Sequence, residues 1–161
     1  MIAVVDGAAI GAGLDLALMC DMRLASDRAV FAQSFIRLGL VSGDGAAWLL
    51  PRIIGGSRAS EMTFTGEPVD AERAPAWGWV SAVHRPEEVF EKALALADHI
   101  ARHPPHSGRL NKRLLRESER ADLNQSLEIA ASLQALAQTT EDFREAVSAF
   151  LDRREPRFNG C

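Results

Sequence analysis

The sequence has only two cysteines, Cys20 and Cys161, which lie far apart and lack the spacing of metal ligands. Cys20 falls in an apolar helical run and is expected to be a reduced core residue. This use of cysteine fits a cytoplasmic protein without a metal site.

Long hydrophobic runs and an excess of positive charge are also absent. The apolar residues Met1 to Val5 end at Asp6, which leaves a run far too short for a signal peptide or a membrane span. Asp and Glu (22) outnumber Lys and Arg (18), so the formal net charge is -4. A chain with this balance has no electrostatic reason to bind nucleic acid. Neither membranes nor nucleic acids are expected as partners.

Glycine, in contrast, is concentrated near the start of the chain. The residues Ile2 to Val5 predict a buried strand, and the residues from Gly11 to Met19 predict a helix that is apolar on almost all faces. Between them, the run from Gly7 to Gly13 contains three glycines, which permit a tight turn and the close approach of a ligand. The first N–H groups of a helix lack intrahelical acceptors and lie at the positive end of its dipole. This corner is therefore expected to hold negative charge, on an anion or on a carbonyl oxygen that becomes an enolate.

Two common phosphate-binding motifs do not fit this corner. A dinucleotide-binding fingerprint needs a third glycine at position 16, where the chain has Leu16. A P-loop needs Gly-Lys-Ser or Gly-Lys-Thr, which the chain lacks. A nucleotide-binding oxidoreductase is therefore disfavoured, and a purely structural glycine corner remains an alternative.

The pattern of the chain changes near Pro86. Residues 1–85 combine short strands with helices, whereas residues 86–161 have helical patterns only. Asp122 and Thr140 are predicted N-caps in the second region. The chain is therefore expected to have an α/β core followed by a helical region.

Within the first region, strands are predicted at residues 22–25, 29–33 and 79–83. A glycine loop at residues 39–45 precedes a predicted helix, and Ser57 and Asp70 are predicted caps of two more. The first strand, residues 2–5, has the character of a strand in the middle of a sheet, yet no earlier strand can pair with it. We therefore expect the chain to be a fragment of a longer protein or to receive a neighbouring strand from another chain.

The segment from Ile2 to Asp21 contains the glycine corner, and further motifs follow it in a fixed order. These are Phe31, Leu38-Gly39, Gly43, Leu50-Pro51-Arg52, Gly55, Ala59, Glu61-Met62, Thr65-Gly66, Ala74, Gly78, Val80, Ala149-Phe150-Leu151, Arg153-Arg154, Pro156 and Phe158. Together they resemble the enoyl-CoA hydratase/isomerase (crotonase) superfamily over the whole chain. The resemblance implies part of a crotonase-like ββα spiral core in residues 1–85 and a helical oligomerisation region in residues 86–161.

The resemblance gives the corner a role. It implies that the backbone N–H of Ala12 is the second donor of an oxyanion hole, where many members of the family have glycine. Members are usually longer, and the additional part is N-terminal. That part normally supplies the first donor and much of the loop that binds CoA.

The resemblance also indicates the acid–base residues. In the hydratases two glutamates act on one water; their positions match Asp15, which is one methylene shorter, and Phe35, which cannot transfer a proton. Asp44, between Gly43 and Gly45, resembles an aspartate of the dienoyl-CoA isomerase branch, and Asp15 matches another aspartate of that branch. Two carboxylates beside a thioester can move a proton between carbon atoms through a stabilised dienolate. The simpler alternatives are a turn residue for Asp44 and a first-turn helix charge for Asp15.

Substrate contacts are implied for residues of the corner, the following loop and the tail, namely Gly11, Gly13, Phe35, Gly43, Trp48 and Phe158. From their surroundings in the sequence, Trp48, Trp77 and Trp79 are expected to pack in the core.

The leading hypothesis is an enzyme that stabilises a thioester enolate and transfers protons, either hydrating an enoyl-CoA or isomerising its double bond. No cofactor is expected beyond the CoA of the substrate, and the resemblance implies a homotrimer or hexamer. The alternative, which Phe35 favours, is a non-catalytic module of the same fold that binds acyl-CoA or only oligomerises.

Overall fold

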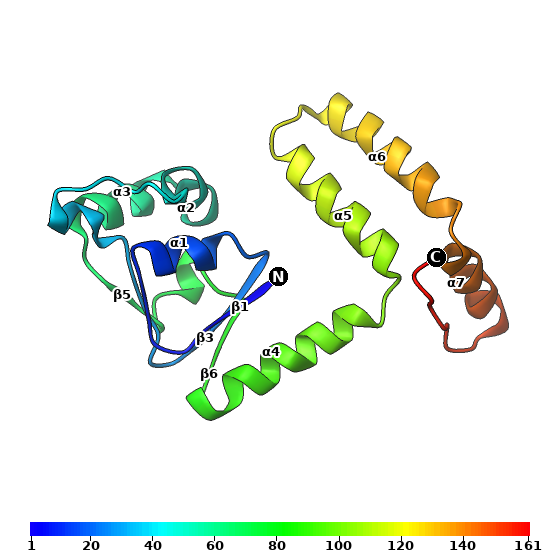
Figure 1. The fold of residues 1–161 in the computed structure, drawn as a ribbon, viewed down its shortest axis with the longest axis horizontal. Helices are drawn as coiled ribbons and strands as arrows, with labels where there is room; N and C mark the ends of the chain where they lie inside the picture. The colour runs from blue at the N-terminus through cyan, green and yellow to red at the C-terminus, as the bar shows by residue number, and fades with distance from the viewer. The chain divides into compact units, whose positions relative to one another are not determined.

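The structure is a computed structural model that describes residues 1–161. The chain divides into two compact units, Met1–Ala97 and Asp98–Cys161. The first unit contains every strand, and the second is helical (Figure 1). This arrangement confirms the predicted mixed α/β region followed by helices. No helix combines the length and apolar character that crossing a bilayer requires.

Six short strands form two three-stranded sheets in the first unit. In one sheet, all strands are parallel and lie in the order β1 (Ile2–Val5), β3 (Met22–Ser26) and β6 (Ala82–His84). In the other, the order is β2 (Ala8–Ile10), β4 (Val30–Ala32) and β5 (Val69–Asp70), with only the β4–β5 pair antiparallel. β1 is thus an edge strand whose parallel neighbour, β3, comes from later in the same chain.

Part of the glycine run forms regular secondary structure that the sequence did not predict. Gly7, with a φ of 149°, lies between β1 and β2 and so carries the chain from one sheet to the other. The sequence predicted a glycine turn between β1 and α1 and missed the strand within it, because Ala8–Ile10 form β2 and pair with β4.

Helix α1 (Ala12–Leu18) follows β2 and buries Leu14 and Leu18 in the core. The apolar character of this helix predicted burial on most of its faces, but one side is open, since Leu16 is 67% exposed. Cys20, just beyond the helix, is only partly buried and is not a core residue.

The next helices, α2 (Ala46–Ile54) and α3 (Gly56–Thr65), lie side by side (Figure 1). The backbone of Gly55, with a φ of 81°, separates them, and no side chain caps α3. The predicted cap Ser57 is therefore wrong, because the helix begins one residue before it. Asp70 does accept a hydrogen bond from the Arg73 N–H (2.9 Å), but it begins a turn and a short 3₁₀ helix at Pro75–Trp77.

Only one of the three tryptophans lies in the core. Trp79 is fully buried and stacks on Phe31, with 5.1 Å between the ring centroids. Trp77 is half-buried beneath the guanidinium groups of Arg58 and Arg73. The core prediction is therefore right for Trp79, right in part for Trp77, which packs against the edge of the core, and wrong for Trp48, which is described with the site.

Helix α4 (Pro86–Ala101) begins where the sequence pattern changes, yet it packs on the first unit. Its buried residues Val89 and Ala93 contact Leu24 of β3. The other helices, in the second unit, are α5 (Pro105–Ser118), α6 (Leu123–Gln138) and α7 (Glu141–Asp152).

Both predicted caps of the second unit are confirmed. Asp122 accepts a hydrogen bond from the Gln125 N–H (2.9 Å), and the Gln125 side chain accepts one in return from the Asp122 N–H (3.3 Å). Thr140 Oγ1 accepts from the Phe143 N–H at 3.1 Å. These local bonds satisfy N–H groups that would otherwise lack partners at the helix starts.

Candidate functional site

The glycine corner ends in a backbone conformation that suits glycine. Gly11 has φ 55° and ψ -120°, and its N–H donates to the carbonyl of Ala32 at 2.9 Å. Ala12 is then the first residue of α1, so its N–H has no acceptor within the helix. Ala12 is exposed and does not have a positive φ, which means that alanine fits the position without strain. The corner therefore places an exposed residue, whose N–H has no acceptor within the helix, at the start of α1.

Asp15 lies in the first turn of the same helix, but its side chain points into the protein. Its exposed fraction is 0%. Gln33 Nε2 donates a hydrogen bond to Asp15 Oδ1 at 3.0 Å, and Ser42 Oγ donates one to Oδ2, also at 3.0 Å. Asp15 therefore has the fixed, doubly hydrogen-bonded carboxylate of a functional or structural site, rather than a solvated first-turn charge.

Gln33 and Ser42 were not identified from the sequence. Gln33 directly follows β4 and is 1% exposed, and its Oε1 has no hydrogen-bond partner. A glutamine at the end of an apolar strand was the available signal, because an amide there needs a buried partner. Ser42 carried no comparable signal, since serine is common in glycine loops.

The glycine loop of residues 39–45 reaches Asp15 through Ser42. Asp44, two residues later, is exposed, as is Gly43, and Gly45 (φ 107°) precedes α2. The structure thus brings the loop that carries Asp44 to the buried carboxylate of Asp15. It shows no hydrogen bond between the two aspartates, and the catalytic role of Asp44 stays a prediction.

Phe35 lies against the glycine corner. It belongs to a 3₁₀ helix at Ser34–Leu38 and is half-buried. A Cβ placed on Gly11 would lie 3.5 Å from Phe35 Cζ, which is ordinary van der Waals contact. The residue that the resemblance matches to the second glutamate is therefore an apolar ring next to the corner.

Two other predicted substrate-binding residues lie at the surface of the first unit. Trp48, on α2, is 38% exposed, and the Arg52 guanidinium lies 3.8 Å from the centre of its ring. Gly13 contributes to a shallow, mostly apolar groove at the outer side of the corner, where Leu16 also lies. The groove residues are Ala3, Val4, Val5, Asp6, Gly7, Ala8, Ala9, Gly13, Leu16, Ala17 and Cys20.

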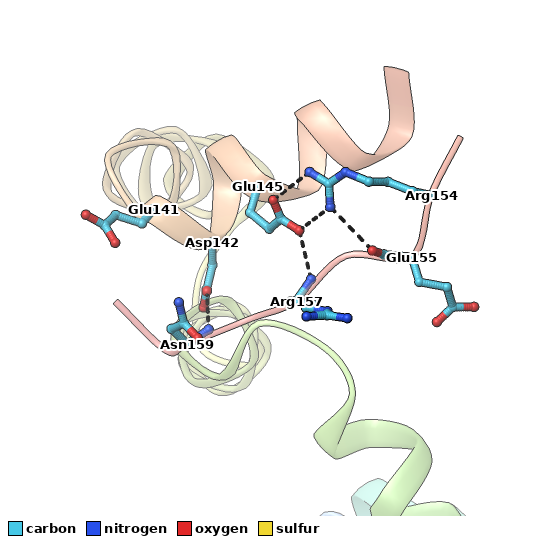
Figure 2. Close-up of a pocket in the computed structure, with 7 residues that line it drawn as sticks. All are labelled: Glu141, Asp142, Glu145, Arg154, Glu155, Arg157 and Asn159. Carbon is cyan, nitrogen blue, oxygen red and sulfur yellow. Dashed lines mark hydrogen bonds and ion pairs between the residues drawn. The ribbon is translucent and has the colours of Figure 1, made fainter. Parts of the chain in front are cut away.

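Phe158 lies in the second unit and is half-buried. It belongs to the C-terminal segment that folds back along α7 around a polar depression (Figure 2). Here Arg154 forms a two-pronged ion pair with Glu145 (2.6 and 2.8 Å), and the Arg157 N–H donates to the same carboxylate. Asp142, which is 2% exposed, accepts from the N–H groups of Asn159 and Gly160. These contacts fix the segment, while the role of Phe158 in substrate binding stays a prediction.

Acidification is expected to release this C-terminal segment. The bonds from Arg154 and the Arg157 N–H lower the pKa of Glu145 from 4.5 to about 2. Because its pKa is lower in the folded state, the stabilisation is present above pH 4.5 and is lost as the pH falls toward 2. The protection factor of the Arg157 amide, which is the exchange rate of an unstructured amide at the same pH divided by its own, should fall over this range.

The same exchange should accelerate at neutral pH in Arg154→Ala. Glu155→Gln, which changes a neighbouring side chain outside the ion pair, is the matched control and should leave exchange unchanged. Equal protection of the Arg157 amide in Arg154→Ala and the unmodified protein would contradict the assigned role of the ion pair.

No group of three or more His, Cys, Asp or Glu residues is arranged to hold a metal ion. His99 and His103 of the second unit contact each other edge to face, with 5.6 Å between their ring centres.

Comparison with known proteins identifies the family to which this chain belongs. The family model described as enoyl-CoA hydratase/isomerase matches residues 1–161. Among curated proteins, 2,3-dehydroadipyl-CoA hydratase of Escherichia coli is 41% identical over 99% of this chain and 63% of its own length. The 1,2-epoxyphenylacetyl-CoA isomerase of the same organism is 38% identical over 99% of this chain and 61% of its own length.

Solved structures give the same result for the fold. A crystal structure of enoyl-CoA hydratase/isomerase from Cupriavidus metallidurans has a TM-score of 0.91 and 40% identity, covering 99% of this chain and 60% of that one. The predicted crotonase-like fold is therefore confirmed. The chain spans about three fifths of the length of these relatives.

Proposed function

Because the chain belongs to the enoyl-CoA hydratase/isomerase family, we propose that it forms part of an enzyme that binds an acyl-CoA thioester and stabilises its enolate. The supporting observation is the arrangement of one short helix: α1 begins at the exposed residue Ala12, whose N–H has no acceptor within the helix, and carries in the same turn the buried carboxylate of Asp15. A donor placed at a developing oxyanion lowers the barrier to enolate formation, and a nearby carboxylate can accept or return the proton.

The relatives point to two reactions, since one is named a hydratase and another an isomerase. Phe35 supplies no carboxylate, so two carboxylates at the family positions cannot share one water. Double-bond isomerisation through Asp15 and Asp44 therefore suits this chain, and hydration remains the second reaction to test. We propose that CoA enters only as part of the substrate and that the enzyme acts in the cytoplasm.

A complete oxyanion hole needs a second donor beside Ala12. We propose that residues outside this chain's 161 provide it, in keeping with the greater length of the relatives. Gly11 cannot provide it, because its N–H is bonded to the Ala32 carbonyl.

We also propose that the second unit assembles copies of the protein into a homotrimer or hexamer. Its helices leave many large apolar side chains more than half exposed, which is costly unless a partner covers them. They are Leu115, Leu123, Leu127, Leu136, Phe150 and Leu151.

The second candidate function is a non-catalytic module that binds acyl-CoA or only oligomerises. The complete burial of Asp15 and the presence of Phe35 favour it. Turnover and binding separate the two candidates.

The test assays the full-length protein, as its gene encodes it, with a 2-enoyl-CoA and with a 3,5-dienoyl-CoA. Calorimetric titration with an acyl-CoA then measures binding. Turnover of either substrate is the expected result, and the preferred one identifies the reaction. Binding without turnover would favour the non-catalytic module, and the absence of both would contradict an acyl-CoA function.

A further inference from the structure

Asp15 cannot by itself reach a substrate in the structure. Its side chain has an exposed fraction of 0%, and each carboxylate oxygen accepts a hydrogen bond from another side chain. Any proton that Asp15 exchanges with a bound molecule must therefore pass through a neighbouring group.

Of the two side chains bonded to Asp15, Ser42 is the one that lies closer to solvent. Its Oγ lies 3.0 Å from Asp15 Oδ2, and the residue is half-buried, whereas Gly43 and Asp44 after it are exposed. A hydroxyl that donates its proton to a carboxylate keeps two lone pairs with which it can accept another. Ser42 therefore links the buried carboxylate to the accessible side of the loop.

Gln33 holds the inner side of the same group. Its Nε2 donates to Asp15 Oδ1, while its Oε1 is buried and has no partner. A buried acceptor without a partner is unfavourable. The position of this amide therefore does not satisfy all of its own hydrogen-bonding groups. The amide instead fixes the carboxylate with Oδ2 turned to Ser42.

We propose that the Ser42 hydroxyl relays protons between Asp15 and the bound acyl-CoA, an inference that rests on the proposed function. As a proton leaves the substrate, its bond to carbon breaks and a bond to Ser42 Oγ forms. At the same time the original Ser42 O–H bond breaks and its proton joins Asp15 Oδ2. The electron pair left by the proton passes to the thioester oxygen at the Ala12 N–H. Reversal at another carbon returns the proton, regenerates both residues and requires no oxidant or reductant.

The relay also accounts for the length of the side chain at position 15. Asp is one methylene shorter than the glutamate that the family resemblance associates with this position. The hydroxyl of Ser42 extends the reach of the shorter carboxylate without exposing its charge.

The test measures turnover of the preferred acyl-CoA by the full-length protein, as its gene encodes it, in mixtures of H₂O and D₂O. The proton taken from carbon does not exchange with solvent, so the relay carries one exchangeable proton, that of Ser42, and kcat should fall linearly with the D₂O fraction. Ser42→Ala should lower kcat about 100-fold with little change in KM, and its solvent isotope effect should be lost. Ser42→Thr, which keeps the hydroxyl, should recover most of the rate, and Ser57→Ala is the matched surface control.

The outcomes separate this inference from the proposed function. Turnover by the unmodified protein without a solvent isotope effect, or an undiminished kcat in Ser42→Ala, would overturn the relay and leave the acyl-CoA function in place. If the unmodified protein turned over no acyl-CoA, both would be overturned. The isotope measurement on the unmodified protein does not depend on how well either variant folds.

Discussion

Replacing Ala12 with proline is expected to lower kcat for the preferred acyl-CoA by about 10² to 10³, because it removes the proposed donor to the oxyanion. Proline is suited to this position. Ala12 is the first residue of α1, where proline's fixed φ matches the helix and the missing N–H costs no helical hydrogen bond. The substitution should therefore remove the donor while α1 remains folded.

Two controls isolate the donor from other effects of proline. Ala12→Gly keeps the N–H and should retain most of the activity. Gly56→Pro introduces proline at the first position of α3, away from the corner, and tests the general effect of proline at a helix start. If Ala12→Pro were as active as Ala12→Gly and had the same melting temperature, the N–H of Ala12 would have no role in catalysis.

The local elements of this fold were predictable from short stretches of sequence. The strand at Ile2–Val5, the helix after the corner and the N-caps at Asp122 and Thr140 depend on residues within about one helical turn. Ser57 shows the limit of such reasoning: a good capping residue was present, but Gly55 is the N-cap, because its positive φ turns the chain before Ser57 is reached.

The partners of Asp15 could not be predicted in the same way. Gln33 and Ser42 are 18 and 27 positions further along the chain. They meet Asp15 because β4 pairs with β2, and because the glycine loop then folds back to the start of α1. Such contacts depend on tertiary packing, which the spacing of residues in sequence does not encode. The family resemblance identified Asp15, but not its burial or the groups that surround it.

Replacing Asp15 with asparagine is expected to lower kcat by about 10³ to 10⁴, a larger loss than that of any other single change considered, because no other buried carboxylate adjoins the corner. Asparagine is nearly the same size but cannot accept a proton. KM should change much less than kcat, since Asp15 is fully buried and does not contact a bound molecule directly. Steady-state kinetics with the preferred acyl-CoA measures both.

The fold should survive this substitution at a modest cost. Both oxygens of Asp15 accept hydrogen bonds, from Gln33 and Ser42, whereas asparagine offers one oxygen and one NH₂ group. One of the two donors must therefore turn away or lose its acceptor, which destabilises the protein by about 1 to 3 kcal/mol. Asp27→Asn, at an exposed turn between strands β3 and β4, is the matched control and should leave both kcat and melting temperature unchanged.

The combination of results decides what the buried carboxylate does. A large loss of kcat with only a modest fall in melting temperature is expected if Asp15 exchanges protons with the substrate. A fall in melting temperature without a loss of kcat would mean that Asp15 only holds the glycine loop to α1. In that case Asp44, which is exposed on the same loop, would be the remaining carboxylate able to move a proton beside the corner.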